Sequence, residues 1–146
     1  MSFQFSLQSV LKVRQSERNE LRQAVSLLER DHAAAVQAGE SLHATRDKVL
    51  EELRNLNDAE ALSPEQIATR HRYCEQLGRE LLQLQATIRL AKRRWDLGLK
   101  ELIAVDQSVK SLERLAERQR SEYLRSSLKA ERLEFDDSLR SHRRVA

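Results

Sequence analysis

A short polar segment divides the chain: Asn55-Leu56-Asn57-Asp58-Ala59-Glu60-Ala61-Leu62-Ser63-Pro64. Its end has the features of a helix start, because the Ser63 hydroxyl can accept a hydrogen bond from the backbone and Pro64 has no N–H to leave unpaired. Gln66, three residues after Ser63, completes the pattern of a capping box. We therefore predict a turn over residues 58–63 and a helix that begins at residue 64.

The composition excludes most other architectures. The 146 residues include only 3 glycines and 1 proline, too few turn residues for a many-stranded β fold or an α/β nucleotide-binding fold. Charged residues make up 34% of the chain and aromatic residues 4%, a balance that suits a narrow seam between long helices. The single cysteine excludes an internal disulfide framework. Since no secretory signal and no membrane-spanning run is recognisable, we expect a cytoplasmic protein.

A long heptad pattern follows the break. Its first core position is apolar or small throughout: Ile67, Cys74, Leu81, Ile88, Trp95, Leu102, Val109, Ala116, Tyr123 and Ala130. The second core position lies three residues after each of these: Arg70, Leu77, Leu84, Ala91, Gly98, Val105, Leu112, Gln119, Ser126 and Leu133. No core position is polar between residues 77 and 116, and a seam this continuous predicts a coiled coil.

A weaker heptad pattern precedes the break. One core position reads Leu7, Arg14, Leu21, Leu28, Ala35, Leu42, Val49 and Leu56, and the other reads Leu11, Arg18, Val25, His32, Gly39, Arg46 and Leu53. Three arginines and a histidine interrupt this seam. The segment would be a marginal helix alone, but it can pack against the more regular helix after the break.

Two helices with a short connection favour an all-α fold, an antiparallel coiled-coil hairpin in a single domain. We predict the first helix over about 4–57 and the second over about 64–141, so that the second overhangs the first. A turn near residue 60 would place residue 4 opposite about residue 116. The second seam becomes polar at Gln119 and Ser126, just beyond the point that faces the N-terminal end of the first helix. Both observations indicate that pairing stops there.

No pattern of catalytic, cofactor-binding or metal-ligating residues is recognisable, so we expect no enzyme, no cofactor, no metal and no small-molecule ligand. Cys74 and Trp95 occupy seam positions, where a small hydrophobe and a bulky filler are the expected roles. Gly98 can make room for a large side chain on the facing helix. His32 is interpreted as a tolerated polar interruption of the seam.

Basic residues gather in the second helix. They form one cluster, Arg89, Lys92, Arg93 and Arg94, and then continue along the overhang. A solvated helix face is the simplest interpretation, and a docking surface for an acidic groove is the next. Nucleic-acid binding is disfavoured, because acidic residues are interspersed and no aromatic residues stand on the basic face to stack bases.

Three stretches together are similar to one known family. They are Phe3-x-Phe5-x-Leu7-x-x-Val10-Leu11-x-x-Arg14 at the start, Tyr73, Leu77 and Trp95 in the middle, and Leu112-x-x-Leu115-x-Glu117-Arg118 followed by a charged helix up to Asp136-Asp137. In these stretches, and in length, break position and overhang, the chain resembles the FliJ family of flagellar type III export. The resemblance implies a non-enzymatic antiparallel coiled coil, similar to the stalk subunit of rotary ATPases.

The resemblance also implies partners and a location. The partners are the hexameric export ATPase FliI with its regulator FliH, the export-gate membrane protein FlhA and, in some members, export chaperones. The location is the inner face of the cell membrane at the flagellar base, and the process is flagellum biogenesis, with motility and chemotaxis depending on it. The family's gate contact would fall on Tyr73, Leu77, Glu80 and Leu84, although Glu80 replaces a small apolar residue, and Leu77 and Leu84 also belong to the seam.

The overhang is the expected ATPase-docking end. Apolar residues stand among charges there at Tyr123, Leu124, Leu128, Leu133 and Phe135, and antiparallel pairing brings the N-terminus alongside. The expected docking residues are Phe3, Phe5, Arg118, Tyr123, Arg125, Leu128, Lys129 and Arg132. Three alternatives stay open: the equivalent stalk protein of a virulence injectisome, a structural homodimeric coiled coil, and a basic RNA-binding coiled coil.

Overall fold

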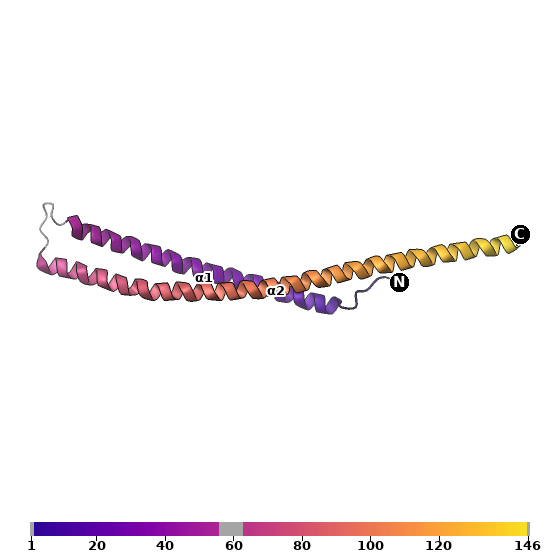
Figure 1. Cartoon of the computed structure of the whole chain (residues 1–146), viewed down its shortest axis with the longest axis horizontal. Helices are drawn as coiled ribbons and strands as arrows, with labels where there is room; N and C mark the ends of the chain where they lie inside the picture. The colour runs from indigo at the N-terminus through magenta and orange to yellow at the C-terminus, as the bar shows by residue number, and fades with distance from the viewer. Residues whose placement is uncertain (1, 56–62, 146) are drawn as a thin grey trace. The chain divides into compact units, whose positions relative to one another are not determined.

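The computed structural model describes residues 2–55 and 63–145. These residues form two helices, α1 (Gln8–Arg54) and α2 (Pro64–Val145), and contain no strand. Figure 1 shows the two helices, coloured by residue number from indigo near the N-terminus to yellow near the C-terminus. The all-α prediction is confirmed, and the two helices pack against each other as a hairpin does. Of the predicted turn over 58–63, residues 58–62 lie outside the described residues.

The chain divides into two compact units. We call Met1–Glu20 with Leu102–Ala146 the terminal unit and Leu21–Glu101 the central unit. Each unit contains a stretch of α1 and a stretch of α2, so helix pairing is described within each unit separately.

The start of α2 has the predicted capping box. The backbone N–H of Gln66 donates to the Ser63 hydroxyl at 3.3 Å, and the backbone N–H of Ser63 donates to the Gln66 side-chain oxygen at 3.1 Å. The N–H of Ile67 donates to the Ser63 carbonyl at 3.1 Å. Together these bonds satisfy groups that a helix N-terminus otherwise leaves unpaired, which explains why α2 begins at Pro64.

In the central unit the seam consists of the predicted residues. Val25 on α1 is buried, as are Cys74, Leu77 and Leu81 on α2. A Cβ built on Gly98 would lie 3.1 Å from Leu28 Cδ1, so this glycine does make room for a large side chain on the facing helix. The contacts run in opposite directions along the two helices, which confirms antiparallel pairing in this unit: Gly98 with Leu28, Gly39 with Ile88, and Gly78 with Arg46.

The polar seam positions of α1 in this unit face particular features of α2. The His32 ring lies against Trp95, with ring centroids 5.4 Å apart. The Arg46 guanidinium lies over Gly78, 3.8 Å from where a Cβ would stand. Each polar residue therefore faces either an aromatic ring or the space that a glycine leaves.

In the terminal unit the N-terminal segment covers α2. Phe5, Leu11 and Val109 form the buried cluster, and the half-buried hydrophobic residues Phe3, Val105, Leu112, Leu115 and Ala116 pack against it. Residues 2–5 have no helical structure, and α1 begins at Gln8 instead of near residue 4. Two residues apart in a helix, Phe3 and Phe5 would point about 200° from each other. In an extended chain they point to the same side, so both rings can reach α2.

One ion pair of the terminal unit joins its two helical stretches, and a second within α2 shares its carboxylate. Arg18 Nη1 donates to Asp106 Oδ1 at 3.3 Å, and Lys110 Nζ lies 3.0 Å from Asp106 Oδ2 on the same helix. The hydrogen bond from Lys110, aided by its charge and by Arg18, holds the pKa of Asp106 below its usual value despite partial desolvation. Arg14 is exposed and pairs instead with Glu17 on its own helix at 2.9 Å.

Pairing in the terminal unit ends where the seam becomes polar. Gln119 is still half-buried, Ser126 is exposed, and every residue from 128 to 145 is exposed. The last part of α2 therefore extends beyond the cover of the N-terminal segment, as predicted for an overhang.

Candidate docking surfaces

The end of α2 exposes a row of hydrophobic side chains. Leu124, Leu128, Phe135 and Leu139, here called the terminal stripe, have exposed fractions between 49% and 65%. They follow one another by four, seven and four residues, which places all of them on one face of the helix. Large side chains aligned in this way form the kind of face that a helix normally buries against a partner.

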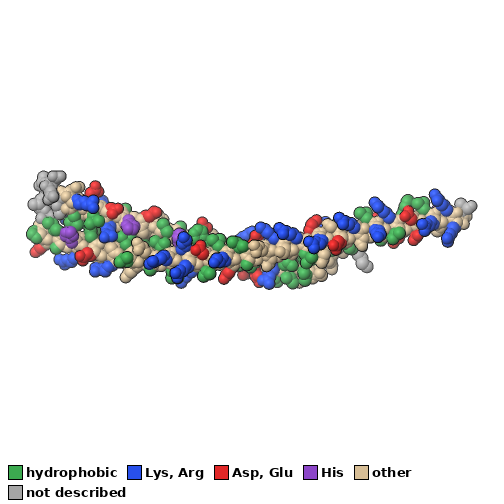
Figure 2. All heavy atoms as spheres, in the orientation of Figure 1, with side chains coloured by type: hydrophobic (Ala, Val, Ile, Leu, Met, Phe, Trp, Pro, Cys, Tyr) green, Lys and Arg blue, Asp and Glu red, His purple; other side chains and the backbone are tan. Residues whose placement is uncertain are grey.

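Basic side chains flank the terminal stripe. Arg125 and Arg132 lie three and four residues from Leu128, the spacing of neighbours on a helix surface, and Lys129 stands between them in the same row. These three residues and Arg118 are exposed, and within the described chain they form no ion pair. Figure 2 shows Lys and Arg side chains beside hydrophobic ones along this end of α2. The edge of the stripe therefore suits an acidic partner.

The three aromatic residues expected at the ATPase-docking end occupy different environments. Phe3 is half-buried and its ring lies 5.6 Å, centroid to centroid, from that of Tyr123. Phe5 is 8% exposed and packs in the core cluster. Phe5 therefore holds the N-terminal segment on α2, and any effect on docking would act through that segment.

Two leucines of the overhang differ from the sequence interpretation. Leu133 lies five residues after Leu128 and two before Phe135, which places it on the far side of the helix from the terminal stripe. Leu139 belongs to the stripe although the sequence analysis did not include it. The signal was present, because Leu139 lies four residues after Phe135.

The residues expected at the export gate divide between surface and seam. Tyr73 is 44% exposed and Glu80 is exposed, whereas Leu77 is 3% exposed and Leu84 is half-buried. Tyr73 and Glu80 are seven residues apart and share one helix face. The Glu80 carboxylate accepts a hydrogen bond from the Gln76 side-chain amide at 3.3 Å. Of the four, Tyr73 and Glu80 are the two that are exposed and so available to a partner.

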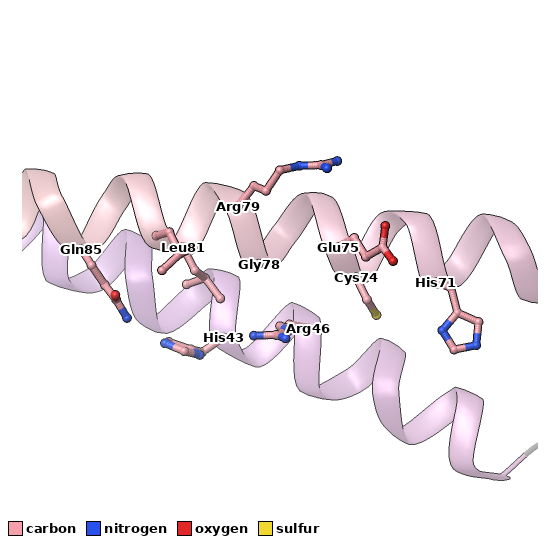
Figure 3. A pocket seen from close by; sticks show the side chains of 10 residues that line it. His43, Arg46, His71, Cys74, Glu75, Gly78, Arg79, Leu81 and Gln85 are labelled. Atoms are coloured by element: carbon pink, nitrogen blue, oxygen red, sulfur yellow. The ribbon is translucent and has the colours of Figure 1, made fainter.

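A groove lies beside these residues between α1 and α2. Figure 3 shows His43 on α1 near Leu81 on α2, with Arg46 next along the groove, and Arg79 pointing away from α1. His71 and Cys74 line the groove further toward the start of α2. The Arg46 Nε atom is buried and has no hydrogen-bond partner among the residues that the structure describes. Within the same residues no group of side chains is arranged to hold a metal ion.

A comparison with protein families shows to which family the chain belongs. The model of the family described as Flagellar FliJ protein matches residues 3–146. The chain belongs to the FliJ family. No match is found among curated proteins or among solved structures.

Membership of the FliJ family gives the chain a role related to flagellar protein export. The family match includes both the terminal stripe and the Tyr73 region. Among the described residues of this FliJ-family protein, no helix is long and apolar enough to cross a membrane.

Proposed function

We propose that this FliJ-family protein is a non-enzymatic part of the flagellar export apparatus whose terminal stripe docks on the ring of the export ATPase FliI. The observation that supports the proposal is the row Leu124, Leu128, Phe135 and Leu139, which the described residues of its own unit leave exposed. A helix exposed on all sides lacks the tertiary packing that normally supplies most helix stability. Burial of this row against a partner would supply that packing.

Basic residues beside the terminal stripe can steer this docking. Arg125, Lys129 and Arg132 stand along one edge of the stripe and can steer it toward an acidic surface on the ring. Steering of this kind raises the association rate and weakens with salt, because the Debye length is about 8 Å at physiological ionic strength. The hydrophobic row then supplies the affinity that slows dissociation.

A second contact would link the ring to the export gate. The exposed face with Tyr73 and Glu80 is our proposed contact for FlhA, and Leu77 supports it from the seam. This contact would bring the protein to the inner face of the membrane at the flagellar base. FliH and export chaperones complete the proposed set of partners.

ATP hydrolysis by purified FliI tests the docking proposal. The double variant Leu128→Ser, Phe135→Ser should need well over tenfold more protein for half-maximal stimulation, because full burial of each large side chain contributes about 1.5–3 kcal/mol and about 1.4 kcal/mol corresponds to tenfold. Leu133→Ser is the matched control, because this leucine is equally exposed at 58% but lies off the stripe. It should stimulate like the unchanged protein.

A truncation after Ser127 provides a second test of the docking proposal. It keeps Tyr123 and its contact with Phe3, so pairing in the terminal unit is retained while most of the stripe is removed. Loss of stimulation with unchanged helix content per residue supports the proposal. Full stimulation by the truncated protein would show that the ring binds another part of the chain.

A further inference from the structure

A second exposed hydrophobic row lies on α2 within the central unit. Leu82, Leu90 and Leu97 have exposed fractions of 66%, 49% and 60%. Successive leucines are eight and seven residues apart, and Ala86 stands midway between the first two, so all four share one face. Leu81, nine residues before Leu90, is buried on the opposite face. We call Leu82, Ala86, Leu90 and Leu97 the outer row, because it faces away from the seam.

Cations border the outer row on both sides. Arg93 lies three residues after Leu90 and four before Leu97, and Arg94 lies four after Leu90 and three before Leu97. These spacings make both arginines surface neighbours of both leucines, one on each side of the row. Arg89 stands beside Ala86 in the same way.

This stretch of α2 has an excess of positive charge. Between Glu80 and Asp96 the helix contains no acidic residue, while it contains Arg89, Lys92, Arg93 and Arg94. All four cations are exposed, and the described residues provide none of them with an ion pair. Repulsion within such a cluster would be relieved by an anionic partner.

We propose that the outer row docks an acidic amphipathic helix of a partner protein, which packs as a third helix on the outside of α2. A helix inserts side chains into a neighbouring helix at positions that repeat about every 3.5 residues. The outer row follows this repeat, with arginine instead of an apolar residue at the one position between Leu90 and Leu97. Glutamates or aspartates flanking the apolar row of the partner would meet Arg93 on one side and Arg94 on the other. This surface is separate from the terminal stripe and does not depend on it.

The charge and the narrow width of the outer row disfavour a second copy of the chain, a lipid surface and a nucleic acid as its partner. A second copy of the chain would place the same arginines opposite one another, and like charges in close contact cost stability. A lipid surface needs a broad apolar face with large aromatic residues, whereas this row is one residue wide. A nucleic acid would need stacking rings, and Trp95 is half-buried against His32.

A designed peptide can test the surface in the full-length protein. The probe is a fluorescent helical peptide with leucine at heptad positions a and d and glutamate at e and g. Its matched control has lysine in place of each glutamate. We expect binding of the glutamate peptide that weakens with added salt, and no binding of the lysine peptide.

Variants assign the binding to the outer row. The double variant Leu90→Gln, Leu97→Gln should weaken binding about tenfold or more, since two leucines lose their burial. Arg93→Glu, Arg94→Glu should abolish binding of the glutamate peptide and allow binding of the lysine peptide. Leu27→Gln and Arg30→Glu are matched controls on exposed positions of α1 and should bind normally. Circular dichroism should show equal helix content in all variants.

Several outcomes would overturn the proposal. The glutamate peptide failing to bind, or both peptides binding equally, would remove the basis in charge complementarity. Tighter binding to phosphatidylserine vesicles or to DNA, lost in the Arg93→Glu, Arg94→Glu variant, would assign the cations to a membrane or a nucleic acid. A dimer that dissociates in the Leu90→Gln, Leu97→Gln variant would make a second copy the occupant.

Discussion

At the scale of single residues, three of the four polar side chains in the seam of α1 lie against particular features of α2. A polar group withdrawn from water costs free energy unless it finds a partner. In a parallel homodimer each arginine would face its own copy. The observed contacts therefore favour the α1–α2 pair: Arg18 with Asp106, His32 with Trp95, and Arg46 over Gly78.

The glycines of the seam give a direct test of this packing. A Cβ at Gly39 would stand 3.5 Å from Ile88 Cδ1, an ordinary contact, so Gly39→Ala should stabilise the protein by about 1 kcal/mol through helix propensity. At Gly98 the Cβ would stand 3.1 Å from Leu28 Cδ1 and 3.3 Å from Val25 Cγ2. Gly98→Ala should therefore lose most of that gain. Urea unfolding of both variants measures the difference, and an equal gain at the two sites would contradict the packing described here.

The ion pairs of Asp106 predict a specific acid sensitivity. Its folded-state pKa lies below its unfolded value of about 3.9, so its contribution to stability is complete above about pH 5 and is lost as the pH falls through the folded pKa. The unchanged protein should thus be more stable than Asp106→Asn at pH 7, and the difference should shrink toward pH 3.

Urea unfolding at a series of pH values measures this difference. Glu113→Gln is the control, an exposed carboxylate for which no ion pair is formed with any described residue. A stability difference between Asp106→Asn and the unchanged protein that stays constant with pH would show that the carboxylate charge does not stabilise the fold.

At the scale of helices, burial in α2 changes sharply from one residue to the next. Leu81 is 4% exposed in the seam, and Leu82 is 66% exposed in the outer row. Neighbouring residues on a helix point about 100° apart, so one can lie in the seam while the next faces solvent. Exposed apolar residues in α2 are therefore not failures of packing but belong to separate faces of the helix.

This contrast provides a matched pair of substitutions. Leu81→Ala should lower the free energy of unfolding by about 2–5 kcal/mol, because it removes buried contacts and leaves a cavity. Leu82→Ala should change it by no more than about 0.5 kcal/mol. Thermal unfolding followed by circular dichroism compares the two, and equal effects would place the seam at another register.

At the scale of the whole molecule, one helix contains every surface that we propose for binding. The terminal stripe, the Tyr73 face and the outer row all lie on α2, at three stretches of the same helix. α1 covers the seam face of α2 within each unit and leaves the other faces free. For the contacts that we propose, the role of α1 would be to complete the scaffold on which α2 presents these surfaces.

The two helices and their pairing follow from patterns in the amino-acid sequence alone. The capping box at Ser63, the heptad seam of α2 and the opposing seam of α1 are local patterns, and local hydrogen bonding and periodicity suffice to interpret them. The end of pairing near Gln119 was also predictable, since the seam there becomes polar. These features need no knowledge of which side chain meets which.

Where α1 begins, and which residues of one motif are buried, depend on contacts between distant residues and are seen in the tertiary structure alone. Phe3 and Phe5 lie outside α1, which begins at Gln8, and both rings pack with the buried cluster of the terminal unit, where they bury apolar surface. The burial of Leu77 and the exposure of Tyr73 divide one sequence motif between seam and surface. Periodicity indicates which residues share a face, but the packed neighbour determines which face water can reach.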